Sequence, residues 1–262
     1  MTEKSSILQK ISEAEMILIG IGEEFDDNRV FRQEAGYEAE RENLLQSKLS
    51  FLLPAYQRYY RERAGSQVYE ALCGLAGLVE GKNYFVVATT TNDVVEQVPW
   101  RKGHLVTPCG GSRGKQCTCG CEEGLVPVEK EDRERIRGFF EKDSHERNYD
   151  EISLGRCPKC NAPLVLNNIY AENYDEKGYL KQWEMYTRWL QGTLNKRLLI
   201  LELGVGMQFP SVIRWPFEKI AFFNQKAEFY RVNEKLYQLS EELKEKGTSI
   251  SENAIDWLRF LC

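Results

Sequence analysis

The stretch that decides the fold is residues 83–121, NYFVVATTTNDVVEQVPWRKGHLVTPCGGSRGKQCTCGC. Its apolar opening, residues 84–89, predicts a buried strand. A polar strand-end loop follows at residues 90–93, then a Pro-Cys-Gly-Gly turn and a group of closely spaced cysteines. One short segment therefore holds both candidate catalytic groups and candidate metal ligands, and we expect the rest of the chain to support it.

Length and charge limit the classes of protein that the chain can be. With 262 residues, 42% of them hydrophobic, it can bury the core of one α/β domain with an inserted module. Its 35 basic and 40 acidic residues give a net charge of -5, and the basic run at 133–137 alternates with acids. That pattern is typical of a solvated helix face, so we expect no nucleic-acid partner.

The hydropathy of the chain and its first ten residues predict a protein without a membrane-spanning helix or a signal peptide. We find no apolar run near the roughly 18 residues that a membrane-spanning helix requires. The opening MTEKSSILQK lacks the apolar core of a signal peptide. The sequence therefore predicts a cytoplasmic protein with no membrane partner.

The clustered cysteines favour a metal site over disulfides, because thiols stay reduced in the cytoplasm. Cys157 and Cys160 form a Cys-x-x-Cys knuckle, whose spacing suits two of the four ligands of a tetrahedral zinc site. The other cluster offers three sulfurs for two places. Cys117 with Cys121 is the preferred pair, and Cys119 stays open as an alternative to Cys121.

An apolar strand ending in Gly20 and Gly22, followed by a helix start, is typical of the entry to a dinucleotide-binding unit. Glycines at this turn let backbone amides approach a pyrophosphate. The sequence EEFDD that follows puts carboxylates where a phosphate needs donors. These acids could instead satisfy first-turn amides and the helix dipole, which would leave no anion site.

Tight pyrophosphate binding at this turn has a further requirement. Glu23 and Glu24 would repel the phosphates unless a nearby cation neutralised them. Arg29 and Arg32 are the candidates, and either would have to fold back onto the glutamates.

The remaining chain alternates helical and strand patterns. Helices are expected at 7–14, through most of 28–80 with 68–78 covering a sheet, and at 128–147 and 179–190. Strands are expected at 162–166, at 198–206, which is apolar enough to be buried on both faces, and finally at 227–233. The predicted strand ends are Gly20, Thr89, Thr107, Gly204 and Asn233.

This alternation predicts an α/β fold with a Rossmann-like, doubly wound parallel sheet and a site along the carboxyl ends of its strands. We expect a discontinuous nucleotide-binding domain at 1–27, 81–108 and 166–262. A helical insertion occupies 28–80 and a small zinc-binding module occupies 109–165.

The order of these motifs resembles the sirtuin family over nearly the whole chain. The segment LELGVGMQFPSVIRWPF, residues 201–217, is most similar to the macrodomain-linked branch. The resemblance implies an NAD-binding Rossmann domain with a zinc module. That branch is associated with ADP-ribosyl transfer to proteins, whereas ordinary sirtuins remove acyl groups from lysine. The NAD-site residues that it implies are Gly20, Gly22, Thr89, Thr91, Asp93, Gly204, Val205, Gly206 and Asn233.

Two departures from the sirtuin pattern fall at reactive positions. Where sirtuins carry Thr-Gln-Asn-x-Asp, this chain reads Thr-Thr-Thr-Asn-Asp at 89–93, so the acid is kept and the asparagine is lost or shifted to Asn92. Where sirtuins carry a His-Gly pair with a basic histidine, this chain has Cys109. His104 lies five residues too early, and His145 lies in the predicted charged helix.

Three hypotheses for function follow. In the first, the protein breaks the nicotinamide–ribose bond and passes ADP-ribose to a protein acceptor. Asp93 then grips the carboxamide and stabilises the ribosyl cation, with Asn92 beside it. In the second, the protein is a deacylase in which Cys109 replaces histidine, with Arg113 as the nearest cation to lower its pKa. In the third, it is a catalytically degenerate zinc protein that binds NAD or ADP-ribose.

Asp93 also has a purely structural interpretation. An aspartate just ahead of a helix commonly caps it, and a helix is predicted from Val94.

Overall fold

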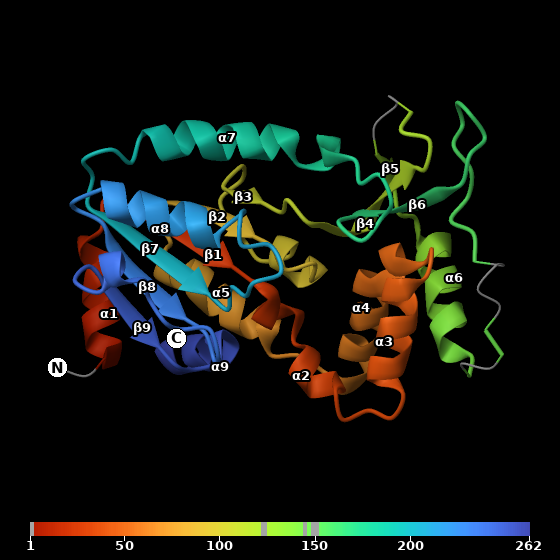
Figure 1. Ribbon diagram of the computed structural model, residues 1–262, viewed down its shortest axis with the longest axis horizontal. Coiled ribbons are helices and arrows are strands. Elements are labelled where there is room, and N and C mark those ends of the chain that lie inside the picture. The colour runs from red at the N-terminus through yellow and green to blue at the C-terminus, as the bar shows by residue number, and fades with distance from the viewer. Residues whose placement is uncertain (1–2, 122–124, 144–145, 148–151) are drawn as a thin grey trace.

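The computed structural model describes residues 3–121, 125–143, 146–147 and 152–262. The chain forms a larger lobe built on a parallel sheet and a smaller lobe of helices and a short sheet (Figure 1). The larger lobe contains α1 (Glu3–Glu13), β1 (Met16–Ile21), η1 (Glu23–Asp26), α5 (Val68–Leu78), β2 (Asn83–Ala88), η3 (Asp93–Glu96), β3 (Leu105–Val106), α7 (Leu180–Gln191), β7 (Leu198–Leu203), α8 (Arg214–Phe223), β8 (Glu228–Val232), η5 (Glu241–Leu243), β9 (Gly247–Ile250) and α9 (Ala254–Leu261). The smaller lobe contains α2 (Asn28–Phe31), α3 (Tyr37–Gln46), η2 (Ser50–Leu52), α4 (Leu53–Ala64), β4 (Gly110–Cys117), β5 (Val126–Pro127), α6 (Lys130–Glu141) and β6 (Leu164–Asn168), and η4 (Glu176–Gly178) leads back to α7.

Six strands form the sheet of the larger lobe within the described residues, in the order β3-β2-β1-β7-β8-β9, and every pairing is parallel. β1 lies at the centre, where Gly20 faces Val87 of β2 on one side and Glu202 of β7 on the other. Parallel strands bring their carboxyl ends to one edge, so the loops after β1, β2, β7 and β8 lie together. The predicted doubly wound parallel sheet is confirmed.

Helices cover both faces of this sheet. α1, α5 and α9 share a core with one face, and α7 and α8 share a core with the other. α5 packs on the sheet because Val68, Leu72 and Leu75 are fully buried against it. The expected helical insertion at 28–80 therefore ends, as a structural unit, before α5.

The smaller lobe has one core made from two separate parts of the chain. Phe31, Tyr37 and Tyr56 from the first part pack with Ile136 and Phe140 of α6 from the second. Within the described residues its sheet is antiparallel, in the order β5-β4-β6. β6 pairs with β4 as far as residue 168.

Two elements differ from the expectation. The expected Pro-Cys-Gly-Gly turn leads directly into a strand, since β4 begins at Gly110 and continues to Cys117. The strand ending at Asn233 is not the last, because β9 pairs with β8 at the sheet edge. The polar residues Thr248 and Ser249 hide this short strand from a search for apolar runs.

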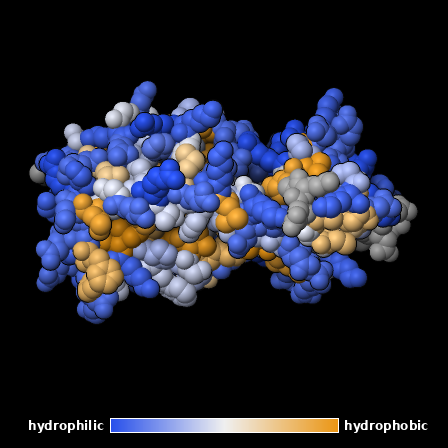
Figure 2. Space-filling view, turned by 90° about the horizontal axis from the view of Figure 1, so that it is seen from above, coloured by the Kyte–Doolittle hydropathy of each residue, from blue (hydrophilic) through white to orange (hydrophobic). Residues whose placement is uncertain are grey.

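The predicted helix 128–147 is α6, Lys130–Glu141, and His145 lies outside the described residues. Among the helices that the structure describes, none is long and apolar enough to cross a membrane. Seen from above, the two lobes are joined by a narrower waist (Figure 2).

Candidate nucleotide site and metal centre

A cavity of about 420 Å³ opens at the carboxyl ends of the strands of the larger sheet. Gly204, Gly206 and Asn233 line it from the loops after β7 and β8, and η1 lines it from the other side. Thr89, Thr91 and Val205 are buried, and the Thr91 amide donates to Asp26, which lines the cavity. Of the predicted nucleotide-binding residues, Gly204, Gly206 and Asn233 therefore line this cavity, whereas Gly20, Gly22 and Asp93 do not.

Close contact between two strand ends explains the glycines of this edge. A Cβ atom added at Gly22 would lie 2.3 Å from the Cα atom of Val205. Gly204 has a φ of +61° and lies against the Cβ atom of Glu24. The backbone packing of β1 against β7 thus requires these glycines even before any ligand is considered.

Two carboxylates already occupy backbone amides around the cavity. Glu23 accepts a hydrogen bond from the Gly206 amide at 2.6 Å. Glu24 accepts one from the Glu234 amide and one from the Ala254 amide, each at 2.8 Å. Burial raises the pKa of Glu24, which adds to the cost of keeping it charged. A phosphate group would have to displace these carboxylates to reach the same amides.

The arginines expected to neutralise these glutamates are paired elsewhere. Arg29 donates to the carboxylate of Asp256 at 2.7 and 3.0 Å. Arg32 lies 3.4 Å from the carboxylate of Glu38. Both arginines nevertheless line the cavity, together with Arg41 and Lys235, so its cations are as many as its carboxylates, which are Glu23, Glu24, Asp26 and Glu234.

Asn233 has a structural task in the loop after β8. Its side-chain oxygen accepts hydrogen bonds from the amides of Lys235 and Leu236, at 2.9 and 2.7 Å. Its amide group donates to the Val205 carbonyl at 3.2 Å. These contacts hold the β7 and β8 loops together and use most of its hydrogen-bonding capacity.

Asp26 is a candidate residue that the sequence reasoning missed. Its carboxylate accepts hydrogen bonds from the Thr90 hydroxyl at 2.7 Å and from the Thr91 amide at 3.0 Å. It is 4% exposed and lines the same cavity as Gly204. Burial raises its pKa to about 6, although the hydrogen bond from Thr90 and the nearby Arg61 act in the opposite direction.

The sequence contained one signal for Asp26. It lies in the acidic run after the Gly-x-Gly turn, but that run gives no indication of which carboxylate faces inward. Burial of the neighbouring Phe25 turns Asp26 toward the loop after β2.

Asn92, rather than Asp93, caps the short helix η3. The Asn92 side-chain oxygen accepts a hydrogen bond from the Val94 amide at 3.1 Å, and its amide group donates to the Phe25 carbonyl at 2.8 Å. The capping alternative for Asp93 was therefore wrong, and Asn92 holds η1 and η3 together.

Asp93 links the two lobes. Its carboxylate accepts hydrogen bonds from the amide and the hydroxyl of Ser112, on β4, and lies 3.4 Å from the guanidinium of Arg58, on α4. It lines a second cavity, of about 510 Å³, together with Gly110 and Gly111. In this arrangement the carboxylate of Asp93 is turned toward the smaller lobe, whereas Asp26 faces the strand-end cavity.

Cys109 is 1% exposed. Burial, with smaller contributions from Glu23 and Asp26, raises the pKa of its thiol far above the ordinary value. The cation considered for lowering that pKa, Arg113, pairs with Glu96 at 2.7 Å. The thiol is therefore protonated at neutral pH and is a poor general base.

Four cysteines form a compact group at the base of β4. The sulfur atoms of Cys117, Cys121, Cys157 and Cys160 all lie within 4.8 Å of one another. Thiolates at the corners of a tetrahedral zinc site lie about 2.3 Å from the metal and so about 3.8 Å apart, which fits this group. Cys119 is exposed and contributes its amide, which donates to the Cys117 sulfur at 3.4 Å.

Together, the six-stranded parallel sheet of the described residues, its strand-end cavity and the cysteine-bearing small lobe define a Sir2-type fold, that of the sirtuins. Solved structures agree. The chain aligns with a Sir2 homologue in complex with NAD at a TM-score of 0.57 and 13% identity, covering 99% of this chain and 93% of that one. It aligns with a mutant Sir2 homologue in complex with ADP-ribose at a TM-score of 0.55 and 14% identity, covering 100% and 95%. This protein is a divergent, sirtuin-like protein by its fold.

The sequence of the chain is also similar to those of two curated proteins. The chain is 23% identical, over 186 residues, to "Protein ADP-ribosyltransferase" of Staphylococcus aureus (strain Mu50), covering 70% of this chain and 58% of that protein. It is 25% identical, over 142 residues, to "Probable bifunctional ADP-ribose hydrolase/ADP-ribosyltransferase" of Fusarium oxysporum, covering 53% of this chain and 24% of that protein. The chain thus spans little more than half of one relative and a quarter of the other. No family model matches the chain.

Proposed function

We propose that this protein cleaves the nicotinamide–ribose bond of NAD and transfers ADP-ribose to a protein acceptor. The fold it shares with complexes of NAD and ADP-ribose supports a dinucleotide at the strand ends. The relative described as a protein ADP-ribosyltransferase supports the transfer reaction.

The observation that carries this proposal is the buried carboxylate of Asp26 at the cavity. Cleavage of the nicotinamide–ribose bond passes through a ribosyl cation and requires little proton transfer. A carboxylate held in a dry site stabilises such a cation by several kcal/mol, because it does not have to reorganise as charge develops. The Thr90 hydroxyl and the Thr91 amide donate hydrogen bonds to Asp26 and so hold its carboxylate in one orientation.

The alternative reaction, lysine deacylation with Cys109 as the base, has weaker support. A base has to accept a proton near neutral pH, and burial keeps this thiol protonated. The cysteine therefore favours a reaction without a strong general base, and we propose that it shapes the turn before Gly110.

Glu23 and Glu24 accept hydrogen bonds from the strand-end amides that a bound NAD would use, so NAD binding requires these two side chains to move. Both carboxylates have to leave the amides of Gly206, Glu234 and Ala254 before a pyrophosphate can reach them. One oxygen of Glu23 is buried and has no hydrogen-bond partner among the described residues, which makes its present position costly by about 1–3 kcal/mol.

The cysteine group is proposed to hold zinc. Four protein ligands complete a tetrahedral site, so zinc there would stabilise the smaller lobe without taking part in the reaction.

A second candidate function is a catalytically inactive protein that binds NAD or ADP-ribose. The same glutamates favour it, because they add negative charge where a pyrophosphate would lie. The absence of the asparagine and the histidine of the sirtuin pattern also favours a catalytically inactive binding protein.

Incubation of purified protein with NAD, with free nicotinamide followed over time, tests the proposal. Steady release, together with ADP-ribose on an acceptor protein, is expected of the transferase. Calorimetric binding of ADP-ribose without any nicotinamide release would support the inactive binding protein instead. Release that depends on an acylated peptide would support the deacylase.

A further inference from the structure

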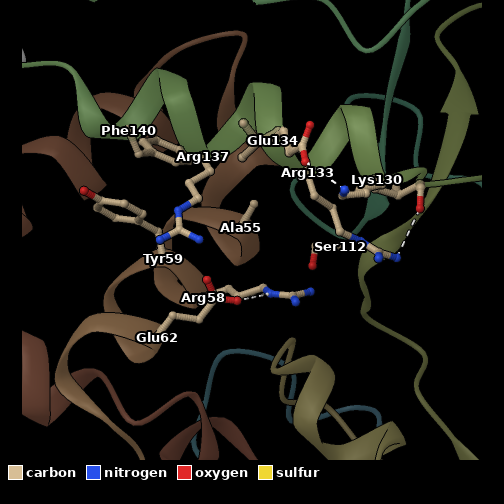
Figure 3. A pocket seen from close by; sticks show the side chains of 12 residues that line it. Ala55, Arg58, Tyr59, Glu62, Ser112, Lys130, Arg133, Glu134, Arg137 and Phe140 are labelled. Atoms are coloured by element: carbon tan, nitrogen blue, oxygen red, sulfur yellow. Dashed lines mark hydrogen bonds and ion pairs between the residues drawn. The ribbon is translucent and has the colours of Figure 1, made fainter.

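A basic groove of about 240 Å³ lies between α4 and α6 in the smaller lobe, away from the strand-end cavity. Figure 3 shows Arg58 reaching from α4 and Arg133 and Arg137 reaching from α6, with Ser112 of β4 between the side chains of Arg58 and Arg133. The proposed function makes no use of this groove.

The charge of the groove is opposite to that of the whole chain. Four cations and two acids line it, whereas the chain has an excess of acids. The lining charged residues are Arg58, Lys130, Arg133, Arg137, Glu62 and Glu134. Arg58, Arg137 and Lys130 each have a carboxylate partner, the last of them Glu134 at 3.5 Å, so the positive charge available to an anionic ligand comes mainly from Arg133.

Arg133 supplies positive charge that its own contacts leave uncompensated. Its guanidinium donates to the Val128 carbonyl at 3.1 Å, a neutral acceptor. Arg58 and Arg137 have carboxylate partners, Glu62 at 2.9 Å and Glu141 at 3.0 Å. Among the described contacts of the three arginines, those of Arg133 therefore leave its charge most available to a ligand.

The floor of the groove is apolar. Ala55 and Tyr59 contribute to it from α4, and Ile136 and Phe140 contribute from α6. A cavity of this volume is smaller than the roughly 300–1,000 Å³ of sites for whole cofactors or drug-sized ligands. It fits one or two side chains, which favours a peptide segment over a nucleotide.

The groove is also connected to the edge of the nucleotide domain. Arg58 and Ser112 line it, and both contact the carboxylate of Asp93 in the loop after β2. A segment bound here would therefore lie next to the junction of the two lobes.

We propose that this groove binds an acidic segment of a partner protein, with one apolar side chain on the floor and carboxylates paired with the arginines. The proposal deepens the proposed function, because such a segment would belong to the protein acceptor.

Fluorescence anisotropy with a labelled peptide tests this in the absence of NAD, so its outcome is independent of whether the protein cleaves NAD. The probe is a peptide of about twelve residues, rich in glutamate, with one central phenylalanine. Saturable binding that weakens with added salt is expected. A peptide in which every glutamate is replaced by glutamine should bind about tenfold more weakly or worse.

Two double variants locate the binding. Arg133→Gln with Arg137→Gln should weaken peptide binding by about five- to tenfold, given the usual strength of exposed ion pairs. Arg135→Gln with Lys142→Gln removes the same charge from outside the groove and should leave the affinity within about twofold. Glu62→Gln with Glu134→Gln removes the competing carboxylates and should strengthen binding.

Equal weakening by both cation-removing double variants would overturn the site, because net charge alone would then explain binding. Displacement of the peptide by an oligonucleotide of equal charge, lost in the Arg133→Gln/Arg137→Gln variant, would overturn the choice of a peptide. Failure of the glutamate-rich peptide to bind at millimolar concentration would overturn the proposal as a whole.

Discussion

Asp26 is the residue on which the proposed chemistry depends most. In an Asp26→Asn variant the carbonyl oxygen can still accept hydrogen bonds from Thr90 and Thr91, but the negative charge is lost. We expect nicotinamide release to fall by about 100-fold or more, the usual cost of removing one preorganised electrostatic group. The measurement is the rate of nicotinamide release at saturating NAD.

Asp27→Asn is the matched control for this variant. It removes the same charge from the next position, and asparagine tolerates the left-handed backbone of Asp27, which has a φ of 56°. Asp27 contacts Ser66 rather than the threonines. Equal loss of activity in both variants would contradict a specific role for Asp26.

The difference in stability between the wild type and the Asp26→Asn variant should depend on pH in a defined direction. Burial raises the pKa of Asp26 from 3.8 to about 6, so the folded state binds the proton more tightly than the unfolded state does. The favourable contribution of the protonated group is fully present below pH 3.8 and is lost as the pH rises through about 6.

Above pH 7 the variant should therefore be more stable than the wild type, by up to about 3 kcal/mol, because it cannot ionise. Near pH 4 the gap should shrink. Denaturant unfolding of both proteins at pH 4 and pH 8 gives the two free energies. A gap that stays constant between these pH values would contradict the burial of a charged Asp26.

Glu23 and Glu24 provide the next prediction. In a Glu23→Gln/Glu24→Gln variant the side chains can still accept from the strand-end amides, but they no longer repel a pyrophosphate. We expect ADP-ribose to bind about tenfold more tightly or better, measured by calorimetry.

The control for this variant is Glu241→Gln/Glu242→Gln, which removes two charges from the exposed helix η5. ADP-ribose affinity should stay at the wild-type value in the control. Absence of binding to wild type and to the Glu23→Gln/Glu24→Gln variant alike, at millimolar ADP-ribose, would remove the basis for a nucleotide site.

At the residue scale the sequence predicted positions better than roles. Gly204, Gly206 and Asn233 lie around one cavity, as expected, because strand ends of a parallel sheet must meet. The roles depend on side-chain direction, which a run of five residues such as EEFDD does not specify. Only the packing of η1 reveals that Glu24 reaches the backbone of the loop after β8 and of the start of α9, while Asp26 reaches the loop after β2.

Among the elements, the paired strands β4 and β6 determine the geometry of the cysteine group. Cys117 ends β4 opposite Leu164, which brings the knuckle of Cys157 and Cys160 against it. A Cys157→Ser variant should lose bound zinc and unfold at a lower temperature, because metal binding and folding of such a module are coupled. Metal analysis and a thermal scan measure both effects.

Cys119→Ser is the control, since Cys119 is exposed and its sulfur lies outside the compact group. It should keep one zinc per chain and the wild-type melting temperature. Zinc loss in Cys119→Ser with retention in Cys121→Ser would reverse the assignment of the fourth ligand.

Element prediction succeeded where strands are apolar and failed where they are polar. β1, β2 and β7 were predicted because burial on both faces requires an unbroken apolar run. β4, with the sequence GGSRGKQC, and β9, with the sequence GTSI, carry no such run. In β4 the buried residues Ser112, Lys115 and Gln116 are polar, and in β9 Thr248 and Ser249 are exposed. Their pairing partners stabilise them, and partners distant in sequence are not visible in a local pattern.

On the scale of the whole molecule, Asp93 connects the sheet lobe to the smaller lobe through Ser112 and Arg58. If this is its main task, Asp93→Asn should lower the free energy of unfolding by about 1–3 kcal/mol, the cost of weakening a buried polar contact. ADP-ribose affinity should stay within about twofold. Denaturant unfolding and calorimetry provide the two measurements.

A double-mutant cycle with Ser112→Ala checks that the two side chains act as one contact, because their effects on stability should then be less than additive. Loss of nicotinamide release in Asp93→Asn with wild-type stability would instead support the original hypothesis that Asp93 grips the carboxamide.

The order of the strands has a consequence for how the chain folds during its synthesis. β1 pairs with β7, so Met16 cannot pair until Leu198 has been synthesised. The core of the smaller lobe likewise cannot form until both of its separate segments have been synthesised. Until β7 emerges, the inner edge of β1 exposes unpaired backbone groups, an arrangement that promotes aggregation. Such long-range pairing slows folding. We therefore expect chains halted before residue 198 to depend on chaperones and to be recovered mainly in the insoluble fraction.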